Sequence, residues 1–181
     1  MTAGMTAGMA ARLLAAAVLA IAAVVAQAAP PVELKPWAGG PAPALGLKDL
    51  EGAAQPLQAY RGKVVVLNFW ATWCEPCRDE MPSLNKLKHS FDGKPVVVLG
   101  VNVGEGEGRI KAFLDKVPVE FPVLLDRDAA ASRVWKVRML PATFILDREG
   151  RIRYSHAGER DWDAPDVRTK VTALLDAKSG R

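Results

Sequence analysis

Continuous apolar runs alternate with amphipathic stretches through the middle of the chain. The runs at 64–70 and 95–103 are apolar at almost every position, which is typical of strands covered on both faces. Shorter runs at 120–125, 142–146 and 151–156 predict three further strands. The pattern therefore predicts a sheet whose central strands are buried.

Helical periodicity appears between these strands. Beyond Cys77, apolar residues return on one face of a helix at 3.6 residues per turn. Further helices are predicted at 109–116, at 163–177 and from Asp128, the expected N-cap, to residue 135. Strands that alternate with helices predict an α/β protein, with a central mixed sheet covered by helices on both faces.

The segments ahead of the first central strand differ in character. Residues 45–50 and 55–57 flank a Glu51-Gly52 turn and predict a small N-terminal β-hairpin. Residues 29–43 hold five prolines and form a Pro/Gly-rich lead-in. The domain proper is expected to span residues 44–178.

The first 28 residues have the composition of a secretory signal peptide. They contain one basic residue, Arg12, and no acidic residue, and an apolar run at 13–25 ends in Ala26-Gln27-Ala28, an A-x-A cleavage pattern. The run is short for a membrane span, although an uncleaved anchor is the alternative. We therefore expect a periplasmic or otherwise extracytoplasmic protein, attached to a membrane only through that anchor if it is retained.

The charge is mild and mixed. The formal net charge is +4, and residues of both signs are interspersed, so the sequence lacks the clustered basic residues typical of nucleic-acid binding. Export would place the chain where disulfides form and persist. A dithiol that works there as a reductant needs a supply of electrons.

The candidate chemistry lies in the only two cysteines, Cys74 and Cys77. They follow the first buried strand and open a helix, where free N–H groups and the helix dipole favour a thiolate. Zinc would need two more ligands, and His89 and His156 stand far apart without ligand spacing. A purely structural disulfide would close too short a loop to stabilise the fold greatly. The context thus favours a reversible redox pair.

Several motifs around this pair resemble the TlpA/ResA-like family of thioredoxin-fold, exported thiol–disulfide oxidoreductases. They are Tyr60-Arg61-Gly62-Lys63, the string from Val66 to Cys77 with Asn-Phe-Trp-Ala-Thr-Trp-Cys-x-Pro-Cys, Glu80-Met81-Pro82, Asn102-Val103 and Leu140-Pro141-Ala142-Thr143-Phe144. The likeness covers roughly residues 43–178, and the long string is far more specific than a bare Cys-x-x-Cys.

The resemblance implies a role for each of several residues. It assigns the attacking thiol to Cys74 and the resolving thiol to Cys77, and it makes Leu140–Pro141 a cis peptide bond beside the disulfide. It implies a family-type insert after the second strand, from which no catalytic residue is carried over. Glu105 in the turn that opens this insert is expected to be a solvated acid, and a part in a partner groove is the alternative. It requires no cofactor and no metal.

Glu80 is the most informative position outside the cysteines. On the helical wheel it falls inside the apolar stripe, one turn beyond Cys77, so burial should raise its pKa and suit it to proton exchange. In thioredoxins a buried Asp before the Phe-Trp pair has this role, but here that position is Asn68, which cannot titrate. The alternative is a solvated carboxylate like its neighbour Asp79.

The remaining site residues bear on the direction of electron flow and on the docking of a client protein. Glu75 should oppose a thiolate at Cys74, which destabilises the reduced form, and with the thioredoxin-like Pro76 this favours a reductant. Trp73, Leu140 and Pro141 are expected to shape a surface on which a partner strand docks.

The sequence therefore predicts an exported reductase of protein disulfides. The resemblance suggests client proteins in cytochrome c or copper-site maturation and a membrane thiol-transporting electron donor. A disulfide-forming oxidase is the alternative within the class, and a copper-binding chaperone that uses two thiolates is the alternative from another class.

Overall fold

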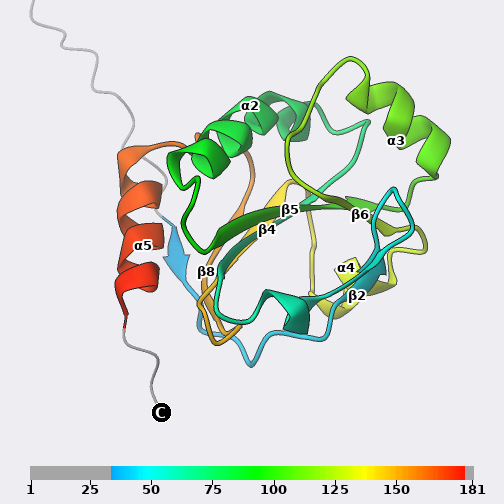
Figure 1. The fold of residues 1–181 in the computed structure, drawn as a ribbon. Coiled ribbons are helices and arrows are strands. Elements are labelled where there is room, and N and C mark those ends of the chain that lie inside the picture. The colour runs from blue at the N-terminus through cyan, green and yellow to red at the C-terminus, as the bar shows by residue number, and fades with distance from the viewer. Residues whose placement is uncertain (1–33, 178–181) are drawn as a thin grey trace, which may run out of the picture. The chain divides into compact units, whose positions relative to one another are not determined.

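The structure is a computed structural model that describes residues 34–177 (Figure 1). The expected signal peptide at 1–28, the first residues of the lead-in and the last residues of the chain lie outside that range. Residues 34–177 belong to one compact unit. No helix within them is long and apolar enough to cross a bilayer.

Six strands form the main sheet in the order β1-β8-β7-β4-β5-β6, and two form a separate hairpin. The strands are β1 (Lys35–Pro36), β2 (Gly46–Lys48), β3 (Ala54–Pro56), β4 (Val64–Trp70), β5 (Val96–Val103), β6 (Val123–Asp126), β7 (Ala142–Leu146) and β8 (Ile152–Ala157). The pairs β4–β5 and β5–β6 are parallel, and β7 pairs antiparallel with both β4 and β8. The expected mixed sheet and N-terminal hairpin are thus confirmed.

The helices cover both faces of this sheet (Figure 1). They are η1 (Leu57–Tyr60, a 3-10 turn), α2 (Glu75–Ser90), α3 (Glu107–Leu114), α4 (Ala130–Val134) and α5 (Pro165–Asp176). Leu84 and Leu87 of α2 pack with Val167 and Val171 of α5 in one core cluster. Leu57 of η1 and Trp135, the residue after α4, belong to the cluster on the opposite face.

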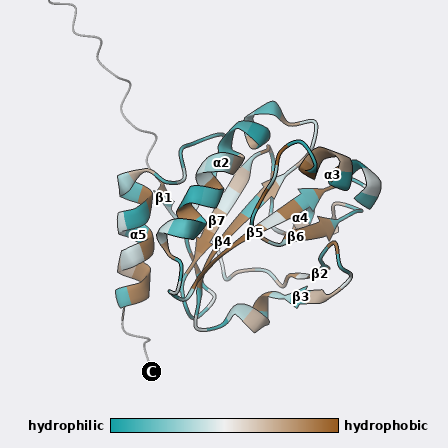
Figure 2. Ribbon diagram, turned by 45° about the horizontal axis from the view of Figure 1, so that its top comes forward, coloured by the Kyte–Doolittle hydropathy of each residue, from teal (hydrophilic) through white to brown (hydrophobic). Residues whose placement is uncertain are grey.

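Strand β4 lies at the centre of both clusters, and all seven of its residues are buried. Val64 and Val66 face α2 and α5, whereas Val65, Leu67 and Phe69 belong to the opposite cluster. Figure 2 shows the central strands as hydrophobic and the outer helices as alternately hydrophilic and hydrophobic. Burial on both faces explains why this strand is continuously apolar in sequence.

The lead-in contributes to the domain. Leu34 lies in the core, and β1 pairs with Tyr154 and Ser155 of β8. Trp37 donates its backbone N–H to the carbonyl of Arg153 and packs edge-on against Phe144, with ring centroids 5.6 Å apart. These contacts extend the sheet by one short edge strand that the proline-rich composition did not predict.

Two predicted elements need correction. The helix expected at 109–116 begins earlier, at Glu107, and the strand expected at 120–125 begins later, at Val123.

The expected cap of α4, Asp128, receives one hydrogen bond from the backbone of Ala130 (3.1 Å), but the buried Asp126 binds two backbone N–H groups deeper in the helix. Asp126, at the end of β6, therefore caps α4 more fully than Asp128, which is closer to the helix in sequence.

Candidate redox site

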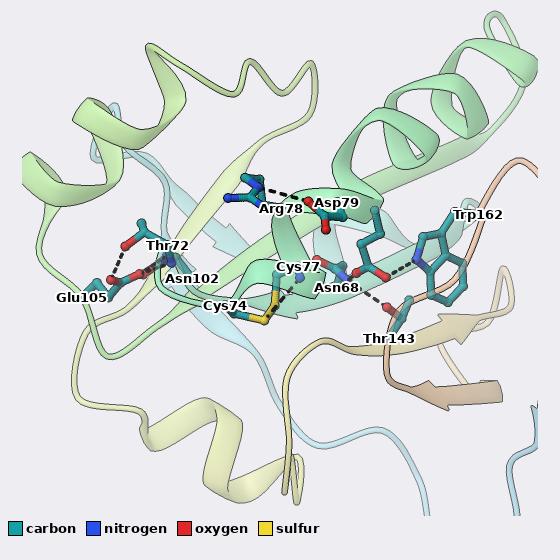
Figure 3. Close-up of a disulfide and its surroundings, with 11 residues drawn as sticks. Asn68, Thr72, Cys74, Cys77, Arg78, Asp79, Asn102, Glu105, Thr143 and Trp162 are labelled. Carbon is teal, nitrogen blue, oxygen red and sulfur yellow. Dashed lines mark hydrogen bonds and ion pairs between the residues drawn. A yellow bond between two sulfur atoms is a disulfide. The ribbon is translucent and has the colours of Figure 1, made fainter.

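The two cysteines form a disulfide where β4 leads into α2 (Figure 3). Cys74 is the N-cap residue of α2, and its Sγ accepts the backbone N–H of Cys77 at 3.3 Å. Pro76 occupies the first turn, where a missing N–H breaks no helical hydrogen bond. When the disulfide opens, the Cys77 N–H and the helix dipole are already directed at the Cys74 sulfur, which favours its thiolate.

The two sulfurs differ in access. Cys74 is 5% exposed and Cys77 is fully buried. An incoming thiol or disulfide can therefore reach Cys74 but not Cys77. The attacking role of Cys74 and the resolving role of Cys77 stay predictions.

Exposed apolar side chains directly precede Cys74 and Leu140 in the sequence. Trp73, next to Cys74, is 64% exposed, and Met139 is 54% exposed. Leu140 is half-buried and packs against the cluster that contains both cysteines. The Leu140–Pro141 peptide bond is cis, as expected, and Pro141 is buried. Large exposed apolar residues next to a reactive group are characteristic of a docking surface for another protein.

Glu75 lies at the outer side of the helix start. Its side chain is 78% exposed and forms an ion pair with Arg78 at 3.3 Å, and Arg78 also binds Asp79. Solvent and this cation weaken the field of the Glu75 carboxylate at Cys74. Its expected effect on the thiolate is therefore smaller than the sequence alone suggests.

Glu80 is buried beneath the disulfide-bearing turn of α2, and only 1% of its surface is exposed. Its Oε1 accepts the side-chain amide of Asn68 at 2.6 Å, and its Oε2 accepts the indole N–H of Trp162 at 2.9 Å. Burial raises the pKa of Glu80 to about 7, although these hydrogen bonds act in the opposite direction. The carboxyl group can thus hold or release a proton near neutral pH.

Trp162 is a site residue that sequence reasoning missed. It lies in the loop between β8 and α5, is fully buried, and donates its backbone N–H to the hydroxyl of Ser83. Ser83 in turn donates to the backbone carbonyl of Glu80. The loop is therefore tied to the acid through both its backbone and its indole ring. The only sequence signal was an isolated tryptophan after a turn.

Glu105 is not the solvated turn acid that was expected. It is buried and accepts hydrogen bonds from the backbone N–H and the hydroxyl of Thr72 and from the amide of Asn102. Arg109 completes the site with an ion pair at 3.0 Å. A glycine-rich turn thus carries a carboxylate that fastens the loop before Cys74.

The two histidines occupy different environments. His89 is exposed and binds Asp92 and Glu120. His156 is buried in β8, and its ring packs edge-on against Trp162 at 5.9 Å. Burial lowers the pKa of His156. Within residues 34–177 there is no group of three or more His, Cys, Asp or Glu side chains placed to hold a metal ion.

Comparison with known proteins agrees with this geometry. Residues 38–155 match the model of the AhpC/TSA family, and the chain belongs to that family. Within it, the chain belongs to the ResA-like thiol–disulfide oxidoreductases of the thioredoxin fold.

Two relatives illustrate the similarity. The thiol-disulfide oxidoreductase ResA of Geobacillus thermodenitrificans is 41% identical over 115 residues, which are 64% of this chain and 66% of that protein. The thioredoxin-like protein YneN of Bacillus subtilis is 41% identical over 123 residues, which are 66% of this chain and 71% of that protein. The chain thus spans about two thirds of the length of these relatives.

Solved structures show the same fold. A putative thiol:disulfide interchange protein DsbE from Chlorobium tepidum superposes with a TM-score of 0.71 at 33% identity, and the match covers 79% of this chain and 99% of that one. A secreted disulfide oxidoreductase of Mycobacterium tuberculosis has a TM-score of 0.61 at 25% identity, over 71% of this chain and 95% of that one.

Proposed function

We propose that this protein is an exported thiol–disulfide oxidoreductase that reduces disulfides in client proteins. The observation that carries the proposal is the disulfide between Cys74, a residue 5% exposed at a helix N-terminus, and the fully buried Cys77. The secreted relative and the apolar N-terminal segment support an extracytoplasmic location.

The reaction is an exchange of two electrons. The Cys74 thiolate attacks one sulfur of a client disulfide, and the other client sulfur leaves as a thiolate that takes up a proton. Cys77 then loses its proton and attacks the Cys74 sulfur of the mixed disulfide. The client leaves with two thiols, and the Cys74–Cys77 disulfide remains.

Glu80 is proposed as the proton-exchanging group for this sequence. Glu80 lies one turn after Cys77 in α2 and is buried. Its pKa of about 7 lets it gain or lose a proton as the Cys74–Cys77 pair is oxidised or reduced. Position 68, where thioredoxins carry a buried Asp, is an asparagine, and the other buried acid near the cysteines, Glu105, is bonded to Thr72 and Asn102, so we assign the proton exchange to Glu80.

The docking surface is proposed to include Trp73, Glu75, Pro76, Leu140 and Pro141. Trp73 precedes Cys74, Leu140 packs against the cluster that contains both cysteines, and the segment that leads to the cis-Pro141 is proposed to pair with a client strand. Clients in cytochrome c or copper-site maturation, and a membrane thiol transporter as electron donor, fit a reductant that works in an oxidising compartment.

Cysteine substitutions test the mechanism. Cys77→Ser should trap clients as mixed disulfides on Cys74, because the resolving sulfur is missing, and Cys74→Ser should trap none and abolish turnover. Non-reducing electrophoresis with and without dithiothreitol measures the adducts. Equal turnover by wild type and either variant would overturn the proposed exchange.

The midpoint potential tests the direction. A value near or below that of thioredoxin, about −270 mV, is expected for a reductant. A value that approaches that of DsbA, about −120 mV, would reverse the electron flow and make the protein an oxidase.

A further inference from the structure

Asn68 holds an unusual position beside the buried acid. It lies in β4, is almost fully buried, and its Nδ2 is within hydrogen-bond distance of two oxygens. One is Oε1 of Glu80 at 2.6 Å, and the other is Oγ1 of Thr143 at 2.9 Å. Figure 3 shows Asn68, Thr143 and Trp162 gathered beside the helix that begins after Cys74.

The backbone N–H of Arg160 also donates to Glu80, and the two side-chain donors, Trp162 and Asn68, differ in what they can do. The indole N–H of Trp162 is a donor only, so it stabilises the charged carboxylate. An asparagine amide carries a donor on one side and an acceptor on the other, in nearly the same shape, and the Thr143 hydroxyl can either accept or donate. Asn68 and Thr143 can therefore serve Glu80 in either of its protonation states.

A protonated Glu80 needs a hydrogen-bond acceptor in this interior. The Asn68 amino group on Oε1, the Trp162 indole on Oε2 and the Arg160 backbone N–H are all donors, so a carboxylic O–H on either oxygen would face a donor and lack an acceptor. Among the described residues, no donor is bonded to Oδ1 of Asn68, so turning the amide over breaks no other hydrogen bond. The reversed amide would present Oδ1 to both oxygens.

We propose that the Asn68 amide reverses as Glu80 gains or loses its proton, and that the Thr143 hydroxyl turns with it. With Glu80 charged, Asn68 donates one N–H to Glu80 and one to Thr143. With Glu80 protonated, Oδ1 of Asn68 accepts the O–H of Glu80 and the O–H of Thr143. Asn68 is thus a positioning residue that keeps the acid paired in both states, and the inference rests on the proposed proton exchange by Glu80.

Other titratable and charged groups surround this cluster. Glu159 and Arg160 lie in the loop that carries Trp162, and Arg160 stacks over the Trp162 ring and binds Asp166 of α5. His156 of β8 packs on the same ring. Cys77 shares the helix with Glu80, but it does not titrate while the disulfide is closed. Measurements on the oxidised protein therefore separate Glu80 from the cysteines.

The first test uses the wild-type oxidised protein. The nuclear Overhauser effect between the Asn68 side-chain amide protons and the Thr143 methyl group is measured at pH 5 and pH 9. We expect a strong cross-peak at pH 9 and a several-fold weaker one at pH 5, with a midpoint at the pKa of Glu80. A cross-peak of constant intensity would overturn the inference. The measurement needs no client, so it stands even if Glu80 has no part in disulfide exchange.

The second test compares the two donors. The pKa of Glu80 is read from the carboxyl ¹³C shift in Trp162→Phe and Asn68→Leu, both oxidised. Trp162→Phe removes a fixed donor that binds the carboxylate more strongly than the neutral acid, so it should raise the pKa of Glu80 by about one to two pH units. Asn68→Leu removes a partner of both states, so the rise should be less than half as large.

The contrary result is equally clear. A fixed donor at 2.6 Å predicts that Asn68→Leu raises the pKa at least as much as Trp162→Phe, and that outcome would overturn the reversal. Thr143→Ser keeps the hydroxyl and is the matched control, so the pKa of Glu80 should stay at its wild-type value. Loss of the pH-dependent exchange rate in Glu80→Gln reports on the catalytic proposal separately.

Discussion

Glu105 binds Thr72 through both the backbone N–H, at 2.7 Å, and the side-chain hydroxyl, at 2.6 Å. The two residues are separated by 33 positions in the sequence. Thr72 lies in the loop that leads to Cys74, whereas Glu105 lies in the turn between β5 and α3. The carboxylate therefore holds the redox loop from the turn that follows the neighbouring strand β5, with support from Asn102 and Arg109.

Removal of this carboxylate should destabilise the protein and loosen the loop. Glu105→Ala leaves the Thr72 N–H and the Asn102 amide without their acceptor, which should lower the free energy of unfolding by about 2–3 kcal/mol. Glu107→Ala is the control, because Glu107 is partly exposed and only forms ion pairs with Lys111 and Arg127. Urea denaturation measures both. Equal losses in the two variants would contradict a special role for Glu105.

The buried Glu80 predicts a pH-dependent stability difference. Its pKa rises from 4.5 to about 7 on folding, so the folded protein holds this proton more tightly than the unfolded chain. Stability from this residue is therefore complete below pH 4.5 and declines as the pH rises through 7. Glu80→Gln does not titrate, so its stability relative to wild type should increase between pH 4 and pH 8 by up to about 3 kcal/mol.

Denaturation at several pH values measures this difference. The lowered pKa of His156 gives a slope of opposite sign, because protonation on acidification favours the unfolded chain, but this slope is common to both proteins and cancels in the comparison. A difference that stays constant with pH would mean that the pKa of Glu80 is not raised.

The parts of the site that the sequence predicted are those that depend on the apolar pattern within one strand or one helix. The redox turn follows from one buried strand next to one helix, and the burial of Glu80 follows from its place on the wheel. Trp162 and Glu105 could not be predicted in the same way. Their roles depend on contacts across the sheet and between loops, and no periodicity within their own segments encodes those contacts.

The N-terminus of α4 shows the same limit. Asp128 has the local position of a cap, and its Oδ1 accepts only the N–H of Ala130. Asp126 accepts the N–H groups of Ala131 and Ser132, because Ala129 adopts a left-handed conformation with φ of 55° that brings the helix start over the end of β6. The backbone conformation, which the sequence pattern did not indicate, decides which acid caps the helix.

A matched pair of substitutions tests this capping. Asp126→Ala leaves two buried or partly buried N–H groups unpaired and should lower the free energy of unfolding by about 2 kcal/mol or more. Asp128→Ala removes one exposed hydrogen bond and should cost well under about 1 kcal/mol. Thermal or urea unfolding distinguishes them, and a larger loss in Asp128→Ala would restore the cap expected from the sequence.

The apolar residues around Cys74 should matter for proteins and not for small disulfides. Trp73 and Met139 expose most of their surface, and a client that docks over Cys74 would cover them. Trp73→Ala and Met139→Ala should each raise KM for a protein client by about tenfold, which corresponds to about 1.4 kcal/mol of lost contact. The rate with oxidised glutathione should change less than about twofold, because that substrate reaches Cys74 without covering the two side chains. Val134, which is 58% exposed on α4, supplies the control. Val134→Ala should change neither the KM for the protein client nor the rate with oxidised glutathione. If Trp73→Ala impaired the reactions with the protein client and with oxidised glutathione equally, Trp73 would act by shaping the redox turn. The docking surface would then have to lie elsewhere.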